Sequence, residues 1–209
     1  SDCVGTFSAR DLDGEKFFQF SDLKPGDSGE NTISVHVADN DAWLAVQFLG
    51  NENADNGVLD PETDSVAENQ LDGQWCGELA QSITYSAWVD DGTTSGWQCN
   101  GEAGCTDDSQ EGDNIFNGQE VRFVDNEQVL SDAAAAASCA NAPAGGQLDT
   151  GWTLLGQVPG GETHFYGIEW KFPLSVGNEA QSDSINMDIQ FGVEQVRNNP
   201  TPFGGLTPS

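Results

Sequence analysis

Two acidic loop sequences carry enough oxygen atoms to bind a metal ion. The first begins directly after an alternating apolar stretch, and the second follows a pair of closely spaced cysteines. The candidate ligands in the two loops are Asp90, Asp91, Asp107, Asp113 and Asn114. Because Ca²⁺ and Mg²⁺ prefer carboxylate and carbonyl oxygens, one interpretation is a structural Ca²⁺ or Mg²⁺ site. The other is that these loops hold no metal and only face the solvent.

The acidic loops do not match the EF-hand, the best-defined calcium motif. That motif needs a Gly in the sixth place for a sharp turn and a Glu in the twelfth that binds the ion through both oxygens. Counting from Asp107, Gly112 is in the sixth place, but Gly118 is in the twelfth. A metal site in this segment would therefore be of another kind.

The two histidines, His36 and His164, lie on alternating stretches between apolar neighbours. Neither belongs to a zinc-binding His-Glu-x-x-His motif, and the chain contains no Gly-x-Ser-x-Gly nucleophile turn. With 35 Asp and Glu residues, no two carboxylates stand out as a glycosidase pair. We therefore predict that the protein is not an enzyme and that both histidines are outward-facing strand residues.

The five cysteines are Cys3, Cys76, Cys99, Cys105 and Cys139, and none of them forms a Cys-x-x-Cys motif. Cys99 and Cys105 enclose a Gly-containing turn that can bring their sulfurs together, so we predict a local disulfide between them. A second disulfide between Cys76 and Cys139 is a weaker prediction. It leaves Cys3 either as a buried thiol or as a link to a neighbouring molecule.

The charge of the chain excludes several classes of partner. Six Lys and Arg residues stand against 35 Asp and Glu residues, which gives a formal net charge of -29. Such a surface is repelled by nucleic acids and by anionic membranes. The repulsion within the molecule falls at molar salt, where the Debye length is about 3 Å. We therefore interpret the chain as a folded protein of a hypersaline medium, the alternative being an acidic secreted protein that binds calcium at ordinary salt.

The chain contains no run of 18 or more apolar residues, so we expect no membrane span in the mature chain. It begins with Ser1 rather than with Met or a basic, apolar leader. We interpret Ser1 as a processed mature end or a chosen boundary. Together with the number of cysteines, this predicts a secreted, extracellular protein at the cell surface.

Alternation of apolar and polar residues predicts an all-β protein. Five stretches show it clearly, namely 33–37, 44–48, 83–89, 166–172 and 185–193. Three weaker candidates are 17–20, 121–124 and 152–155. Because the strands are separated by Gly, Asn and Asp and have one apolar face, we predict an antiparallel, jelly-roll-like β-sandwich.

Helical signal is confined to short inserts between the predicted strands. Residues 60–68 begin with a Pro in the first turn, and residues 126–138 contain a run of five alanines. The segment 90–120 is long, acidic and without periodicity, and we predict a functional or disordered loop there. We divide the chain into an extended N-terminal segment, one sandwich domain and a C-terminal tail, at 1–15, 16–199 and 200–209.

Several short sequences occur in an order that resembles a known family. The first is 20–30 (FSDLKPGDSGE), which is followed by an alternating strand. The others are 39–43 (DNDAW), 78–80 (ELA), 88–92 (WVDDG), 112–116 (GDNIF), 170–174 (WKFPL), 177–184 (GNEAQSDS) and 194–199 (EQVRNN). Together they resemble the TasA/camelysin-like proteins, which are exported with SipW-type signal peptides, and in particular their halophilic archaeal branch.

The resemblance implies a jelly-roll subunit of an extracellular filament, either a biofilm-matrix fibre or a bundling pilus. In such filaments, the N-terminal segment of each subunit completes the sheet of an identical neighbour, which is a form of β-strand addition. The residues that would serve in this donor strand are Val4, Thr6, Phe7, Ala9 and Leu12.

Two alternatives to a filament subunit remain open. One is a monomeric carbohydrate-binding or surface-layer-associated jelly-roll module, in which Trp75 or Trp97 would stack on sugars. The other, a minor one, is a camelysin-like metallopeptidase. The absence of a metal-binding pair of histidines from the sequence argues against the peptidase.

Overall fold

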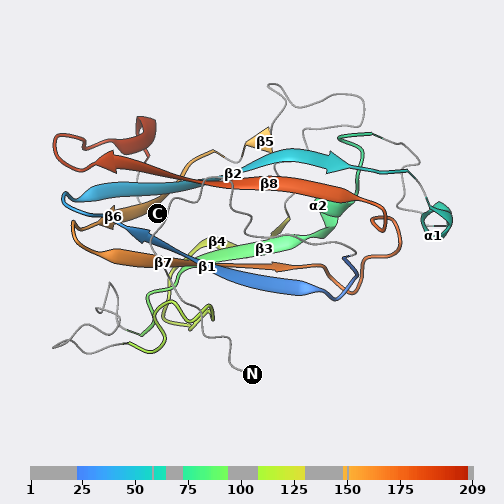
Figure 1. Cartoon of the computed structure of the whole chain (residues 1–209), viewed down its shortest axis with the longest axis horizontal. Coiled ribbons are helices and arrows are strands. Elements are labelled where there is room, and N and C mark those ends of the chain that lie inside the picture. The colour runs from blue at the N-terminus through green and yellow to red at the C-terminus, as the bar shows by residue number, and fades with distance from the viewer. Residues whose placement is uncertain are drawn as a thin grey trace.

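The structure, a computed structural model, describes residues 23–57, 59–64, 73–93, 108–129, 148–149 and 151–206. These residues form two antiparallel sheets that pack face to face (Figure 1). The prediction of an all-β, jelly-roll-like sandwich with short helical inserts is confirmed. The predicted strand at 17–20 lies outside the described residues.

The first sheet, sheet A, has four strands in the order β1-β7-β3-β4. The strands are β1 (Ser28–His36), β7 (Thr163–Lys171), β3 (Thr84–Val89) and β4 (Arg122–Val129). All neighbouring strands run antiparallel, and β1 pairs with β7 over its whole length. Strands β1 and β4 are therefore the edges of this sheet among the described residues.

The second sheet, sheet B, is built around β2 (Ala42–Ala54). One side of β2 pairs with β8 (Ser184–Gln195), and its other side pairs with β6 (Thr153–Val158) and the short β5 (Leu148–Asp149). Strand β5 carries no alternation and was not predicted from the sequence. Among the described residues, β8 thus forms one edge of sheet B, and β5 and β6 form the other.

The core lies between the sheets because alternate residues of each strand face inward. Its centre contains Ile33 of β1, Phe48 of β2, Ala87 of β3 and Ile168 of β7. A second cluster around Leu44 fills one end, and a third around Trp170 fills the other. The alternation in the sequence therefore identified the inward face of these strands correctly.

The helices are short inserts, α1 (Asp60–Thr63), α2 (Leu79–Ser82) and the 3-10 turn η1 (Pro202–Gly204). The predicted helix at 60–68 is present over its first four residues, and its remainder beyond residue 64 lies outside the described residues. The predicted helix at 126–138 is wrong at its start, because β4 continues to Val129 and pairs there with β3. Its remainder also lies outside the described residues.

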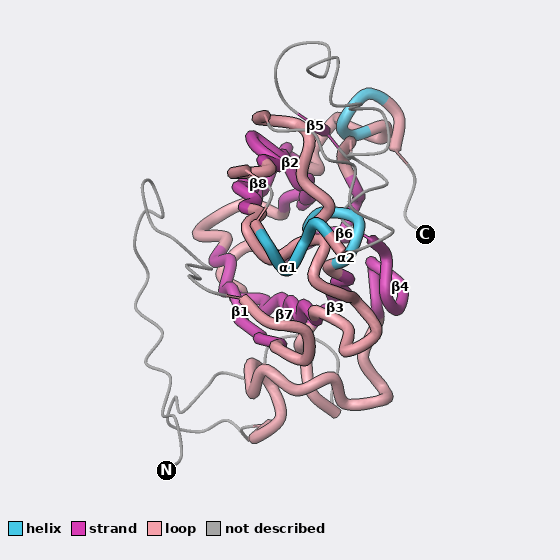
Figure 2. The backbone as a smooth tube through the Cα atoms, turned by 90° about the vertical axis from the view of Figure 1, so that its right-hand side faces the viewer, coloured by secondary structure: helices cyan, strands magenta, loops and turns pink. Residues whose placement is uncertain are grey.

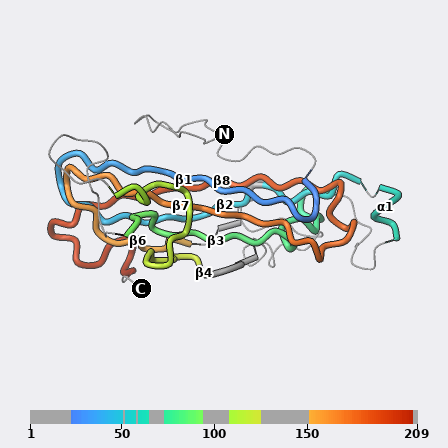
Figure 3. The backbone as a smooth tube through the Cα atoms, turned by 90° about the horizontal axis from the view of Figure 1, so that it is seen from below, coloured from blue at the N-terminus to red at the C-terminus, as the bar shows by residue number. Residues whose placement is uncertain are grey.

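The edge strands of the two sheets lie above one another. Viewed from the side, β1 and β8 follow one flank of the sandwich, and β4 and β6 follow the other (Figures 2 and 3). In the part of the chain that the structure describes, no helix is long and apolar enough to cross a membrane.

Candidate functional site

The flank formed by β1 and β8, which we call the open flank, leaves the side of the core incompletely covered. The inward-facing side chains of β8 are Ile185, Met187, Ile189 and Phe191, and all four are only half-buried although they pack against the core clusters. The equivalent residues of central β2, such as Leu44, are fully buried. The apolar row of β8 is thus accessible from the edge.

Strand β1 is the sheet edge opposite β8 on the open flank. Its Ile33 is buried in the core, whereas Val35 nearer its end is half-buried. Among the described residues, neither β1 nor β8 has a strand paired to its outer edge. Each edge therefore offers a row of backbone N–H and C=O groups that an additional strand can satisfy.

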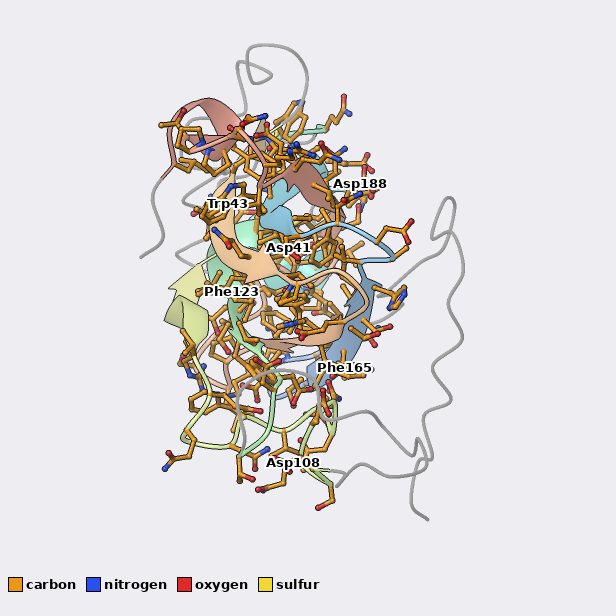
Figure 4. All side chains as sticks on the ribbon, turned by 90° about the vertical axis from the view of Figure 1, so that its left-hand side faces the viewer. Asp41, Trp43, Asp108, Phe123, Phe165 and Asp188 are labelled. Atoms are coloured by element: carbon orange, nitrogen blue, oxygen red, sulfur yellow. The ribbon has the colours of Figure 1, made fainter. Side chains whose placement is uncertain are left out.

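The open flank is not strongly acidic on the side of β8. Asp188 projects from β8 in Figure 4, and Glu194 is the other acidic residue of this strand. The Glu194 carboxylate is already engaged, because it accepts hydrogen bonds from Asn199 Nδ2 and from the backbone N–H of Phe203. A strand that approaches this edge would thus meet amide, apolar and only a few charged side chains.

The predicted donor-strand residues Val4, Thr6, Phe7, Ala9 and Leu12 lie outside the described residues. The structure therefore describes sheet edges that a further strand could join, and not the predicted donor strand.

The acidic segment 108–121, which we call the covering loop, lies over the outer face of sheet A (Figure 1). Beneath it are Trp88 and Phe165, both almost fully buried although they point away from the core between the sheets. Gly167 sits directly under the Trp88 ring, and a Cβ at Gly112 would lie 2.9 Å from the Phe165 ring. Figure 4 shows Phe165 between sheet A and the loop that carries Asp108. The outer face of sheet A is thus buried around Trp88 and Phe165.

Asp90 joins the covering loop to sheet A at the end of β3. Its backbone N–H donates to the carbonyl of Phe165, and its carbonyl accepts from the N–H of Gly112. Its carboxylate atom Oδ2 accepts from the N–H of Asn114 and lies 3.0 Å from Thr32 Oγ1. The side chain is 0% exposed, and its atom Oδ1 has no hydrogen-bond partner.

Burial raises the pKa of the Asp90 carboxyl group to about 7. The hydrogen bonds from Asn114 and Thr32 oppose this shift, and the nearby carboxylates of Glu120 and Asp113 add to it. Asp90 is therefore protonated over part of the range in which an ordinary carboxyl group is ionised.

The predicted metal ligands are engaged mainly with groups of the protein itself. Asp113 accepts hydrogen bonds from the N–H of Ile115 and from Asn117 Nδ2, and Asp91 lies 3.7 Å from His164 Nδ1. Asp90 and Asn114 are in contact, whereas Asp107 lies outside the described residues. Within the described ranges, no group of three or more His, Cys, Asp and Glu side chains is arranged to hold a metal ion. The Ca²⁺ or Mg²⁺ site stays a prediction.

A second group of buried acids lies near α1 and α2, at the opposite end of β3 from Asp90. Asp183 accepts hydrogen bonds from the backbone N–H groups of Glu78 and Leu79, and burial raises its pKa to about 7, with Asp55 and Glu62 adding to the shift. The members of this group are Asp55, Glu62, Glu78 and Asp183. The sequence did not predict the group because these residues come from four separate segments. The only hint was the acidic insert near residue 60.

Glu62 is the most deeply buried member of this second group. It is 1% exposed, and its carboxylate accepts hydrogen bonds from both the N–H and the hydroxyl of Ser182 and from the N–H of Leu59. Glu62 therefore ties α1 to the segment that leads into β8. Its role in the described structure is to satisfy backbone groups.

The histidines do not form a metal-binding pair. His36 is exposed as predicted, and its Nδ1 lies 3.0 Å from Thr163 Oγ1. His164 is half-buried, with Glu162 Oε2 at 3.3 Å from its Nε2. Because His164 pairs with Val35 and His36 with Thr163, the two histidines are on opposite faces of sheet A. His164 shares the inward face of Val35, so the prediction that it faces outward is wrong.

Two further predicted residues are placed by the structure. Trp75 is 7% exposed, so the prediction that it stacks on a sugar is wrong. Cys76 is disulfide-bonded, while its predicted partner Cys139 and the predicted pair Cys99 and Cys105 lie outside the described residues, as does Trp97.

Comparison with known proteins gives no family for this chain. No known family profile matches it, and no curated protein matches it at a significant level.

Proposed function

We propose that the protein is the structural subunit of an extracellular filament of an extreme halophile, in which the N-terminal segment of one copy adds to the open flank of the next. The observation that supports this best is the half-buried apolar row of β8, opposite the equally uncapped edge of β1. If the subunit covered its core completely on this flank, these side chains of β8 would be buried, as those of β2 are. The filament is homopolymeric and lies at the cell surface.

Strand addition suits both the backbone and the side chains of the open flank. An added strand pairs with the free N–H and C=O groups of an edge, and its alternate side chains enter the gap between the sheets. Strand β8 offers an edge of 12 residues, Ser184–Gln195, and β1 offers nine. Strand β8 is long enough to pair with all ten residues from Val4 to Asp13, and β1 with nine of them.

The composition of the N-terminal segment fits this role in a strongly acidic molecule. Residues 3–10 contain Val4 and Phe7 as apolar side chains, Arg10 as a base and no acid, and Asp11 and Asp13 lie only at the end of the segment. Such a segment brings little like-charge repulsion to a neighbour with a net charge of -29. A contact from one end of a copy to the flank of the next does not close on itself, so it propagates as a fibre.

Electron microscopy of the purified protein in molar salt tests this proposal directly. Fibres are expected, and deletion of residues 1–13 should leave separate particles with an unchanged far-ultraviolet circular dichroism spectrum. Fibres that survive the deletion would exclude the N-terminal segment as donor.

A pair of charge variants separates pocket filling from a general effect of charge. Phe7→Asp places a carboxylate in an apolar pocket and should abolish fibres. Ser8→Asp adds the same charge at the neighbouring position, which faces away from the pocket in an extended strand. It should leave fibres in place. Equal loss in both variants would argue against the strand geometry.

The carbohydrate-binding alternative is tested in the same preparation. It expects monodisperse particles in molar salt and retention on immobilised polysaccharide that is lost in Trp97→Ala. With Trp75 buried, Trp97 is the remaining tryptophan of the two proposed for sugar stacking.

A further inference from the structure

Arg122, the first residue of β4, is held in place by aromatic rings instead of by a carboxylate. Its guanidinium carbon lies 3.8 Å from the ring centre of Phe116 and 6.0 Å from that of Trp88. Trp88 is also its partner across the strands, so both side chains lie on the outer face of sheet A. Stacking of this kind orients the planar guanidinium group and limits its rotation.

An arginine without a carboxylate is unexpected in a chain with 35 acidic and six basic residues. Lys171 shows the ordinary arrangement, with its Nζ at 3.0 Å from Glu169 Oε2. Arg122 forms no ion pair with any residue in the described part of the chain, and its atom Nη1 is buried without a hydrogen-bond acceptor. A buried, unsatisfied donor on a charged group is costly.

Two acids of the covering loop, Glu120 and Asp113, bind backbone and amide groups instead of Arg122. Glu120 accepts from the N–H groups of Gly92 and Asn117 through its two oxygens. Asp113 accepts from Ile115 N–H and Asn117 Nδ2. Neither acid thus neutralises the guanidinium group of Arg122, whose side chain is only partly buried.

Two exposed apolar residues stand next to Phe116 and Arg122 in the sequence. Ile115 is 60% exposed and Val121 is 66% exposed, although both are branched aliphatic residues. Their positions are fixed, because Asn117 Nδ2 donates to the Ile115 carbonyl and the Val121 carbonyl accepts from the N–H of Val89. We call Ile115, Phe116, Val121 and Arg122 the arginine patch.

We infer that the arginine patch is a lateral contact site for a second copy of this chain, whose exposed carboxylate binds Arg122. A rigid arginine with aromatic and aliphatic neighbours is typical of the energetic centre of a protein interface. Two copies that each carry a net charge of -29 repel one another, and a base at their contact offsets part of this repulsion. Every copy also carries exposed carboxylates, whose negative charge is complementary to the positive charge of Arg122 on another copy.

The arginine patch is distinct from the open flank. Strand β4 lies at the edge of sheet A opposite β1, so the two sites face different sides of the sandwich (Figure 3). The lateral contact therefore does not depend on the donor strand, and in a filament it would join neighbouring fibres side by side.

The test is self-association of the full chain in molar NaCl, measured by sedimentation velocity at several protein concentrations and by electron microscopy. Arg122→Gln should weaken lateral association about tenfold, the effect of losing one charge-assisted hydrogen-bonded pair. The matched control is Arg197→Gln, which removes the same charge from an exposed position. It should leave association nearly unchanged. Ile115→Ser should weaken association while the thermal unfolding midpoint stays the same, because this side chain is mostly exposed.

The outcomes separate this inference from the proposed filament. Fibres that never bundle, with no difference between Arg122→Gln and Arg197→Gln, would overturn the lateral contact and leave the filament standing. Dimers that form without any fibres, and that Arg122→Gln dissociates, would support the contact and not the filament. Retention on polysaccharide that Arg122→Gln abolishes, with self-association unchanged, would instead make the patch a sugar site and overturn the inference.

Discussion

The carboxylate of Asp90 accepts a hydrogen bond of 3.0 Å from the backbone N–H of Asn114, and this contact fastens the covering loop to the end of β3. Thr32 completes the arrangement, with its hydroxyl 3.0 Å from Asp90 Oδ2 and 2.8 Å from Asn114 Oδ1. A hydroxyl has one proton and cannot donate to both oxygens. A proton on Asp90 Oδ2 resolves this, since Asp90 can then donate to Thr32 while Thr32 donates to Asn114.

The first prediction is that Asp90 makes the protein less stable as the pH rises toward neutrality. Its folded pKa, about 7, lies above the ordinary value of 3.8, so the folded state binds the proton more tightly than the unfolded state. This stabilisation is complete below about pH 4 and is lost as the pH rises through 7. Asp183 acts in the same direction over the same window.

Urea unfolding between pH 4.5 and pH 8.5 in molar salt measures this effect. Asp90→Asn keeps an oxygen that can accept from Asn114 but does not ionise. It should therefore stabilise the protein at pH 8.5 by about 1 kcal/mol or more and change little at pH 4.5. A pH profile in Asp90→Asn identical to that of the wild type would show that Asp90 does not titrate in this range.

The second prediction concerns the contact between Gly167 and the Trp88 ring. A Cβ at position 167 would overlap the ring, and Trp88 is enclosed between sheet A and the covering loop and cannot move aside. Gly167→Ala should therefore destabilise the fold by about 1–3 kcal/mol, as overpacking does elsewhere. Gly118→Ala is the control, because a Cβ there would meet no atom within 4 Å. Equal unfolding free energies for the two variants would contradict this packing.

The third prediction concerns Glu62. Glu62→Ala removes the acceptor of the Ser182 and Leu59 hydrogen bonds from a buried site, and we expect a loss of about 2–4 kcal/mol in the free energy of unfolding. Asp60→Ala removes an exposed acid of the same helix and should cost less than about 1 kcal/mol. Chemical denaturation of both variants at one pH and one salt concentration measures the difference. A smaller effect for Glu62→Ala than for Asp60→Ala would show that the buried contacts contribute nothing.

Alternation in the sequence predicted the sandwich well and its outer layer poorly. In the stretch 83–89 it correctly placed Ala87 inward, and it placed Trp88 on the face expected to meet solvent. Trp88 is nevertheless buried, because the covering loop packs on that face, and a loop without periodicity gives no sign of where it packs. The run of alanines likewise favoured a helix from residue 126, but pairing of residues 126–129 with β3 outweighed local propensity.

The candidate sites could be predicted only in part, for a similar reason. Asp90 and Asn114 were identified as acidic-loop residues, yet their use in binding the loop to the sheet depends on Thr32, which is 58 residues from Asp90. The open flank is visible only once the strand order is known, since it requires β1 and β8, the first and last strands, to be edges of the two sheets on the same side of the sandwich. Arg122 gave no signal in the sequence, because what distinguishes it is the absence of a nearby carboxylate in three dimensions.

The last prediction follows from the proposed filament, whose fibres should depend on salt. Copies with a net charge of -29 repel one another, and the Debye length grows from about 3 Å at 1 M salt to about 30 Å at 0.01 M. Dialysis into millimolar salt with a chelator and without reductant should loosen and then dissociate the fibres while the disulfides stay intact. Light scattering and electron microscopy follow dissociation, and circular dichroism shows whether the subunits unfold at the same time. Because strand addition buries apolar side chains, whose attraction does not need salt, bundles should separate into single fibres before the fibres themselves come apart. Fibres and bundles that persist unchanged in millimolar salt with the chelator present would contradict the view that screening makes assembly possible.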